Sequence, residues 1–148
     1  MRYESILVLC TGNICRSPMG EVLLDRALAK GGCPARVESA GIGALVDHPA
    51  DPLAVELMSE QGIDLSGHVA RQLTGAMLTD FDLLLVMESG QRRYVEGRWP
   101  LARGRVHDIG RWSDFDVPDP YRGTRDDFEV SLRLIERGIN DWLGKLVR

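Results

Sequence analysis

Cys10 and Arg16 stand in one short stretch whose residue types could hold a phosphate group and attack it. The stretch reads Cys10-Thr11-Gly12-Asn13-Ile14-Cys15-Arg16-Ser17. The guanidinium group of an arginine offers a planar fork of donors that matches phosphate oxygens. A cysteine beside a cation and the start of a helix is favoured as its thiolate, which is a strong nucleophile. The pair therefore predicts phosphoryl chemistry with Cys10 as the nucleophile.

The residues between Cys10 and Arg16 suit the phosphate cradle that this chemistry requires. A loop that leaves a strand and enters a helix directs successive backbone N–H groups inward, which makes an anion-binding nest. Gly12 and Asn13 tolerate the unusual backbone dihedrals of such a nest. Ser17 is close enough in sequence to donate its hydroxyl to the thiolate. The stretch has no lysine and does not match the Gly-x4-Gly-Lys-Ser/Thr pattern of a nucleotide-binding loop.

Asp119 is the candidate general acid for the same reaction. A tyrosine leaving group has a pKa of about 10, so its departure without a proton is unfavourable near neutral pH. Asp119 lies between Pro118 and Pro120, and flanking prolines hold a loop residue in a fixed direction. Asp114 and Asp116 in the same loop are competing candidates.

Short apolar runs and helical spacings alternate along the chain. The apolar runs predict four strands, at residues 5–9, 36–41, 82–87 and 105–108. The helical spacings predict four helices, at residues 17–29, 52–61, 88–96 and 126–146. This alternation indicates an α/β fold, in which a short parallel sheet of about four strands is flanked by helices on both faces. The Cys10 loop follows the first strand, so we expect it at the carboxyl rim of the sheet, where such folds bind ligands.

The composition indicates one domain over residues 1–148 and disfavours several classes of protein. Hydrophobic residues make up 44% of the 148 residues, which suffices for one buried core. A balance of 18 Lys+Arg against 22 Asp+Glu argues against a nucleic-acid-binding protein. Three cysteines do not suggest a disulfide scaffold. The first residues lack the pattern of a signal peptide and no stretch is apolar enough to enter a membrane, so we expect a cytoplasmic protein and, as the simpler case, a monomer.

Taken together, the motifs resemble the low-molecular-weight protein tyrosine phosphatase family over essentially the whole chain. The first shared motif is Val8-Leu9-Cys10-Thr11-Gly12-Asn13-Ile14-Cys15-Arg16-Ser17-Pro18-Met19-Gly20-Glu21, and the second is Asp119-Pro120-Tyr121. Segments 38–41 and 68–72 also resemble family segments. The resemblance implies that Cys10 forms a phosphocysteine intermediate, that Arg16 and the loop amides bind the phosphoryl oxygens, and that Asp119 acts first as acid and then as base. It implies no metal and no cofactor, because the arginine and the amides supply the electrostatic stabilisation.

The same resemblance assigns supporting roles to residues beyond these three. Ser39 and His68, which the sequence alone would place on the surface, match members of a hydrogen-bond network that also includes Asn13 and Ser17. In the family this network shapes the loop and stabilises the thiolate. Cys15 matches a second cysteine that can form a reversible disulfide with the nucleophile under oxidation. The loop residues expected to surround the phosphate are Thr11, Gly12, Asn13, Ile14, Cys15 and Ser17.

Three alternative functions remain open on this scaffold. Thioredoxin-linked arsenate reductases have a similar loop, but they pass a disulfide along further cysteines, and no cysteine follows Cys33. Protein arginine phosphatases typically have Thr at the position of Ile14 and Phe at the position of Tyr121, and an apolar Ile14 favours an aryl ring over a guanidinium group. A non-catalytic phosphotyrosine-binding module is disfavoured, because the nucleophile, the arginine and the acid are all retained.

The residues expected around the pocket resemble those of the bacterial family members that are tied to capsule and exopolysaccharide production. The segment after Ser39 is small or aliphatic at residues 42–46, where eukaryotic members commonly have an aromatic residue, and Arg122 follows Tyr121 in place of a second tyrosine. By this resemblance the partner is the tyrosine-rich tail of a membrane-anchored tyrosine autokinase. We expect Tyr121 to form one wall of the substrate pocket, with Leu45 or its neighbours opposite.

Overall fold

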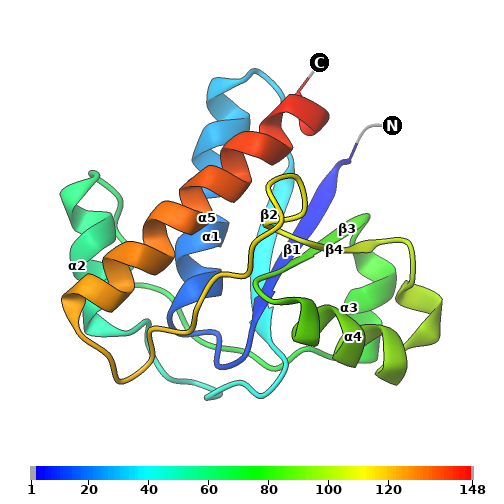
Figure 1. Cartoon of the computed structure of the whole chain (residues 1–148), viewed down its shortest axis with the longest axis horizontal. Helices are drawn as coiled ribbons and strands as arrows, with labels where there is room; N and C mark the ends of the chain where they lie inside the picture. The colour runs from blue at the N-terminus through cyan, green and yellow to red at the C-terminus, as the bar shows by residue number, and fades with distance from the viewer. Residues whose placement is uncertain (1–2, 148) are drawn as a thin grey trace.

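The computed structural model describes residues 3–147, which fold around a parallel sheet of four strands. The strands are β1 (Ser5–Cys10), β2 (Arg36–Gly41), β3 (Leu83–Val86) and β4 (Val106–Asp108). Their order in the sheet is β2-β1-β3-β4, and each pair of neighbours is parallel. The four predicted strands are confirmed to within one residue at each end. Because the strands are parallel, their carboxyl ends share one rim, and β1 brings Cys10 to it (Figure 1).

The strands are joined by helices, two of which are very short. The elements are α1 (Arg16–Lys30), α2 (Pro52–Glu60), α3 (Gly75–Asp80), α4 (Ser89–Arg98), the 3-10 helix η1 (Pro100–Ala102) and α5 (Arg125–Leu146). The four predicted helices are confirmed. The sequence analysis missed α3 and η1, because elements of six and three residues are too short to show a helical period.

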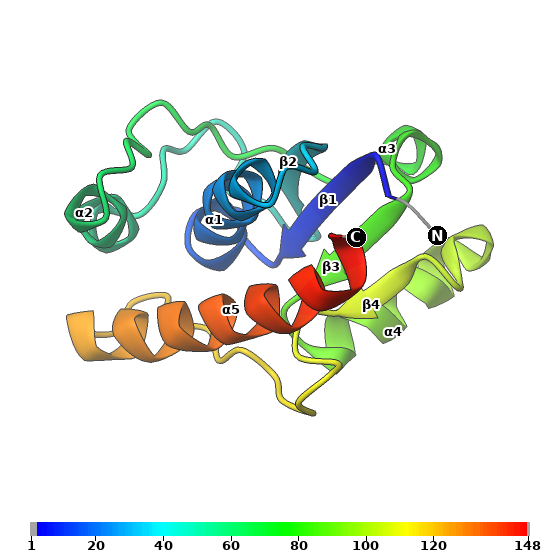
Figure 2. The same cartoon turned by 90° about the horizontal axis from the view of Figure 1, so that it is seen from above.

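Helices cover both faces of the sheet, as the alternating pattern predicted. The helices α1, α2 and α5 lie on one face, and α3 and α4 lie on the other (Figure 2). The side chains of β1 alternate between the two cores that result. Ile6 and Val8 are buried with the first group of helices, whereas Leu7 and Leu9 are buried with the second. The fold is therefore a single α/β domain with a core on each side of its sheet.

Helix α5 packs closely against the loop after β4, and a glycine in the middle of the helix makes this possible. Thr124 and Asp127 form a capping box that starts the helix. A Cβ atom added at Gly138 would lie 2.7 Å from the carbonyl oxygen of Ile109. This close approach to the loop after β4 requires a residue without a side chain.

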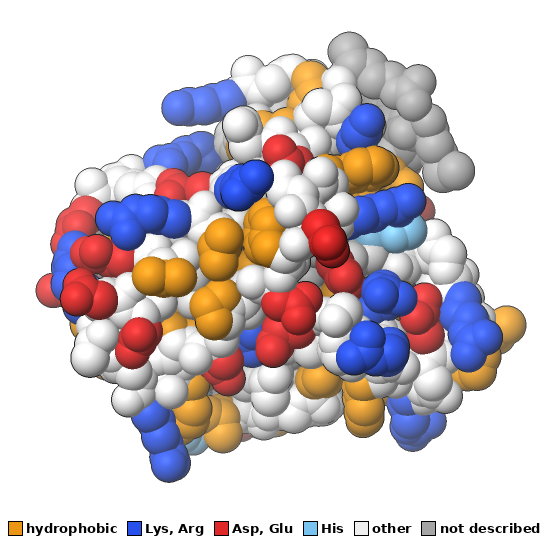
Figure 3. All heavy atoms as spheres, viewed as in Figure 1, with side chains coloured by type: hydrophobic (Ala, Val, Ile, Leu, Met, Phe, Trp, Pro, Cys, Tyr) orange, Lys and Arg blue, Asp and Glu red, His pale blue; other side chains and the backbone are white. Residues whose placement is uncertain are grey.

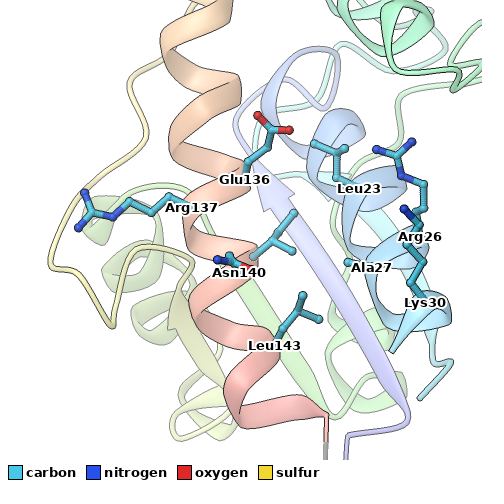
Figure 4. A pocket seen from close by; sticks show the side chains of 9 residues that line it. Leu23, Arg26, Ala27, Lys30, Glu136, Arg137, Asn140 and Leu143 are labelled. Carbon is cyan, nitrogen blue, oxygen red and sulfur yellow. The ribbon is translucent and has the colours of Figure 1, made fainter. Parts of the chain in front are cut away.

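A groove of about 550 Å³ remains on the surface between α1 and α5 (Figure 4). Leu23 and Leu143 line it, Lys30 lies at the edge that α1 forms, and Glu136 projects from α5. Arg137 points away from α1. The edges of the groove thus carry charges of both signs over an apolar floor.

Candidate active site

The loop after β1 surrounds one side of a pocket of about 210 Å³ at the carboxyl rim of the sheet. Three segments that are far apart in the sequence meet there. The residues that line the pocket are Cys10, Thr11, Gly12, Ile14, Cys15, Arg16, Gly43, Leu45, Asp119 and Tyr121. The structure thus brings together the expected nucleophile, arginine, acid and both expected walls. Asn13 and Ser17 lie outside this lining and are completely buried behind the loop.

The buried side of the loop holds Cys10 through a chain of polar side chains. The Sγ atom of Cys10 lies 2.9 Å from the Oγ atom of Ser17. Asn13 Nδ2 donates to Ser17 Oγ at 2.8 Å and to Ser39 Oγ at 3.0 Å. Asn13 has a φ of 58°, in the left-handed region that asparagine tolerates better than most residues. Gly12 is not among the residues with positive φ, so in this loop only Asn13 needs the expected freedom.

His68 and Ser39 join this chain, and both are less exposed than the sequence alone would suggest. The Nε2 atom of His68 lies 2.7 Å from the carbonyl oxygen of Asn13, so the ring nitrogen donates to it. Ser39 is buried and donates to Glu21 Oε1 at 2.5 Å. The backbone N–H of Arg71 donates to Asn13 Oδ1 at 2.9 Å. Both ends of the Asn13 side-chain amide are therefore fixed, which leaves the loop one conformation.

Arg16 is the most buried charged side chain of the site, with 1% of its surface exposed. Its Nη1 atom donates to Glu88 Oε2 at 2.7 Å and to the carbonyl oxygen of Val117 at 2.8 Å. Its Nη2 atom lies 3.6 Å from Asp119 Oδ2. Its buried Nε atom has no acceptor among residues 3–147. An oxyanion in the pocket would supply the acceptor that this N–H lacks.

Glu88 and Gln91, which the sequence analysis missed, tie α4 to the loop. They form the capping box at the start of α4, in which Gln91 Oε1 accepts from the backbone N–H of Glu88 at 3.1 Å. The same Gln91 donates from Nε2 to Thr11 Oγ1 at 3.2 Å. Because Glu88 also accepts from Arg16, one capping box holds two residues of the pocket. A sequence with glutamate followed three residues later by glutamine is a weak capping signal, and only the fold shows what it contacts.

Asp119 is the carboxylate of its loop that reaches the pocket. Its side chain is 46% exposed, and its Oδ1 atom accepts from the backbone N–H of Tyr121 at 3.1 Å. The two competing candidates do not line the pocket, and Asp116 instead accepts from the backbone N–H of Ser89 at 3.0 Å. Ser131 on α5 donates to the carbonyl oxygen of Pro118 at 2.7 Å, which anchors the loop next to Asp119.

The three cysteines are free thiols in different surroundings. Cys10 and Cys15 are both buried at the pocket, and Cys33 lies elsewhere, 3.7 Å from the carbonyl oxygen of Leu146. Burial raises the pKa of the Cys15 thiol far above its ordinary value, and the negative charge of Asp51 raises it further. Both effects favour the neutral thiol form of Cys15, which is a weaker nucleophile than a thiolate.

Within residues 3–147, no three or more His, Cys, Asp or Glu side chains are grouped so that they could hold a metal ion. None of the helices in this part of the chain is both long and apolar enough to cross a membrane.

Comparison with known proteins places the chain in one family. The sequence profile of the family described as low molecular weight phosphotyrosine protein phosphatase matches residues 5–148. The chain is 47% identical over 143 residues to a probable low molecular weight protein-tyrosine-phosphatase, EpsP, of Ralstonia solanacearum, and the match covers 97% of this chain and 96% of that protein.

Solved structures agree with this result. The tyrosine phosphatase Wzb of Escherichia coli K30 in complex with sulphate superimposes with a TM-score of 0.89 at 42% identity, covering 97% of this chain and 98% of the other. A mutant of YwlE from Bacillus subtilis also reaches a TM-score of 0.89, at 29% identity, with 96% of this chain and 97% of the other covered. The chain belongs to the low molecular weight phosphotyrosine protein phosphatase family.

Proposed function

We propose that this protein hydrolyses phosphotyrosine in proteins through a phosphocysteine intermediate on Cys10. The observation that carries the proposal is that Asp119 lines the same pocket as Cys10 and Arg16, although it follows them by more than one hundred residues in the sequence. Such a pocket combines a nucleophile, a fixed cation and a proton donor, which together are sufficient for phosphoryl transfer without a metal.

In the first step the Cys10 thiolate attacks phosphorus and the bond to the phenolic oxygen breaks. Asp119 gives its proton to that oxygen, so tyrosine leaves as a neutral phenol. Arg16 and the backbone N–H groups of residues 11–16 bind the three equatorial oxygens, where charge redistributes in the transition state. The fixed position of the arginine, with both Glu88 and Val117 as partners, means that little reorganisation is needed at that moment.

In the second step a water molecule attacks the phosphocysteine. Asp119, now ionised, takes the proton of that water, and Cys10 leaves as a thiolate. Ser17 stabilises the returning thiolate by donating its hydroxyl, since the two atoms are 2.9 Å apart. We assign Asn13, Ser39 and His68 to the support of that serine and of the loop, on the strength of the hydrogen bonds that join them.

Substrate selectivity follows from the walls of the pocket. Ile14, Leu45 and Tyr121 offer apolar surfaces to the ring of a phosphotyrosine. A guanidinium group would lose its hydration against these walls, which disfavours phosphoarginine. Arsenate reduction lacks its relay, because the remaining thiol, Cys33, lies away from the pocket.

We assign Cys15 as the partner that forms a disulfide with Cys10 under oxidation and so protects the nucleophile.

The whole chain, residues 1–148, would act as one phosphatase domain. We propose that it is cytoplasmic and monomeric and that its substrate is the phosphorylated, tyrosine-rich tail of a membrane-anchored bacterial tyrosine kinase involved in exopolysaccharide or capsule production. The family likeness and the small aliphatic residues at positions 42–46 support this partner.

The experiment that tests the proposal compares matched phosphotyrosine, phosphoserine and phosphoarginine peptides as substrates of the full chain. We expect turnover of the phosphotyrosine peptide alone, and Cys10→Ser should abolish it. Preferred turnover of phosphoarginine would overturn the assigned specificity. Full activity in the Cys10→Ser variant would overturn the mechanism itself.

A further inference from the structure

The segment from the start of α4 to the first residues after β4 is strongly basic in an acidic protein. Residues 89–111 contain six arginines against two carboxylates, whereas the whole chain has 18 Lys+Arg against 22 Asp+Glu. One third of the basic residues therefore lie in a single segment. This segment is not part of the pocket lining.

The fold leaves most of these arginines without carboxylate partners. Arg92 takes both acids of the segment, at 3.4 Å from Glu96 and 3.0 Å from Asp108. Arg105 is turned inward, where it donates to the carbonyl oxygens of Leu78 and Phe81. Within residues 3–147 the other four are in no ion pair, and all four are exposed: Arg93, Arg98, Arg103 and Arg111.

The same segment carries one strongly exposed apolar side chain. Leu101 in η1 is 93% exposed, which is the highest value for a large hydrophobic residue among those the structure describes. Arg98 and Arg103 flank it in the sequence, and the hydrogen bond from Arg103 N to Pro100 O closes the tight turn that carries it. Figure 3 shows basic side chains gathered over α4 and the segment after it, at the lower right of the molecule. We call Leu101 and the four exposed arginines the arginine patch.

We propose that the arginine patch binds an anionic phospholipid surface, with Leu101 inserted among the headgroups. Arginines attract anionic headgroups, and an exposed apolar side chain that lies between two of them in the sequence gains by leaving water for the interface. A side chain that is 93% exposed protrudes from the surface instead of lining a groove. It therefore suits insertion into a soft interface better than the capture of an extended peptide, which needs a groove or a free sheet edge.

Two other anionic partners fit the patch less well. In a complex with the phosphates of a nucleic acid Leu101 would stay in water, so this side chain would contribute nothing to the binding free energy. An acidic protein segment needs a groove with an apolar floor. The groove between α1 and α5 has such a floor, but the carboxylate of Glu136 there would repel an acidic segment. The arginine patch combines unpaired cations with one protruding aliphatic side chain, and this combination is typical of peripheral membrane contact.

The arginine patch and the pocket share one helix. The first turn of α4 contacts Arg16 through Glu88 and Thr11 through Gln91, while Arg98 ends the same helix. A protein attached to a bilayer through the end of α4 would therefore hold its pocket about one helix length, roughly 15 Å, from the point of attachment. The binding of lipid by the arginine patch does not depend on the proposed function. Only the benefit of holding the pocket near a bilayer rests on it, because the proposed substrate is a phosphoprotein anchored in the membrane.

The test is sedimentation of the full chain with vesicles at low ionic strength. One set is pure phosphatidylcholine, and the other contains about one third phosphatidylglycerol, which gives the surface a negative potential. We expect binding to the second set only, and weaker binding as salt is raised. Each arginine near such a surface contributes roughly five-fold in affinity, so the Arg98→Glu, Arg103→Glu double variant should lose at least about 20-fold.

Matched variants separate the arginine patch from net charge. Lys30→Glu with Arg133→Glu changes the total charge by the same amount at exposed positions away from the patch, and it should retain most of the binding. Leu101→Ser should weaken binding without any change in charge. Hydrolysis of a short phosphotyrosine peptide in solution should be the same in all of these variants, so failure of the lipid proposal and failure of the proposed function are distinguishable.

Several results would overturn the proposal. They are equal binding to both sets of vesicles, no binding to either, and an equal loss in the patch variant and in the charge-matched control. Retention of poly-glutamate or RNA by the arginine patch without any binding of vesicles would likewise exclude lipid as its partner.

Discussion

Arg16 and Asp119 face the same pocket but are held very differently. Arg16 is 1% exposed and has two direct hydrogen-bond partners, whereas the Asp119 side chain is 46% exposed and is held by one backbone N–H. The proposed oxyanion site is thus fixed before substrate arrives, and the proposed proton donor is on the exposed side of the pocket, where leaving group and water would pass. This difference agrees with the proposed roles, in which Arg16 only stabilises charge and Asp119 first gives and then takes a proton.

Replacement of Asp119 tests its role as acid. Asp119→Ala should slow hydrolysis of aryl phosphates with poor leaving groups by roughly 10²–10⁴-fold, which is the usual contribution of a general acid. The loss should shrink for phenols of low pKa, because they depart without a proton. The measurement is a series of kcat/KM values against leaving-group pKa, and an equal loss across the series would argue against this residue as the acid.

The elements that form the rim leave little room around the loop, and Gly41 at the end of β2 shows this. A Cβ atom at Gly41 would lie 2.5 Å from the carbonyl oxygen of Thr11, whereas one at Gly43 would meet only a methyl group at 4.0 Å. Gly41→Ala should therefore displace the loop and lower kcat/KM for a phosphotyrosine peptide by about 10-fold or more. Gly97→Ala in α4 is the control and should change little, because an added Cβ atom there meets nothing within 4 Å and Gly97 does not line the pocket. Similar values for the two variants would show that the loop does not depend on this contact.

Helix α5 offers a second matched pair of glycines, with opposite expected signs. Gly138→Ala should destabilise the fold by about 1–3 kcal/mol, because its methyl group would press on the carbonyl oxygen of Ile109 at 2.7 Å. Gly144→Ala has nothing within 4 Å and should stabilise the helix by about 0.5–1 kcal/mol. Denaturant unfolding of the two variants and the parent measures both. A stabilising Gly138→Ala would mean that α5 can move away from β4.

The sequence predicted the elements that have a clear period and the residues that share a motif. It predicted all four strands and the pairing of Cys10 with Arg16 in one loop. It did not predict the partners of Arg16, since Glu88 and Val117 are 72 and 101 residues away and no local pattern marks them. Ser39 and His68 came from the family resemblance alone, because a lone serine or histidine has no spacing that reveals a buried hydrogen bond.

At the scale of the whole molecule, His107 links β4 to α5 and makes stability depend on pH. Its ring packs against Trp142 with 5.7 Å between centroids, and Arg111 donates to its Nδ1 atom at 2.9 Å. Partial burial lowers the pKa of His107, and the positive charge of Arg111 lowers it further. The folded chain therefore binds fewer protons at this site than the unfolded chain does.

The sign of the pH effect follows from that difference. The contribution of His107 to stability is complete above the ordinary histidine pKa of about 6.5, and it falls as pH drops below that value towards the lower pKa of the folded state. The free energy of unfolding should thus decline between neutral and mildly acidic pH, and His107→Gln should decline less steeply. Parallel curves for the two proteins would show that other groups cause the decline.

The charge distribution also divides the molecule into two regions with different expected roles. The lining of the pocket contains a single deeply buried cation, Arg16, which we propose binds one phosphoryl group, whereas the arginine patch has four exposed cations. The net charge of the chain is −4, and this total shows neither the buried cation nor the arginine patch. Net charge alone therefore could not reveal either local site.

Covalent trapping of the phosphoryl group tests the central claim most directly. The full chain would be mixed with a phosphotyrosine peptide, quenched in acid within the first turnover and mapped by mass spectrometry. We predict one phosphoryl group on the peptide that contains Cys10, located on Cys10 and not on Cys15, and none anywhere in a Cys10→Ala variant, which has no nucleophile at that position. A phosphoryl group on another residue, or peptide turnover that persists in the Cys10→Ser variant, would contradict the account.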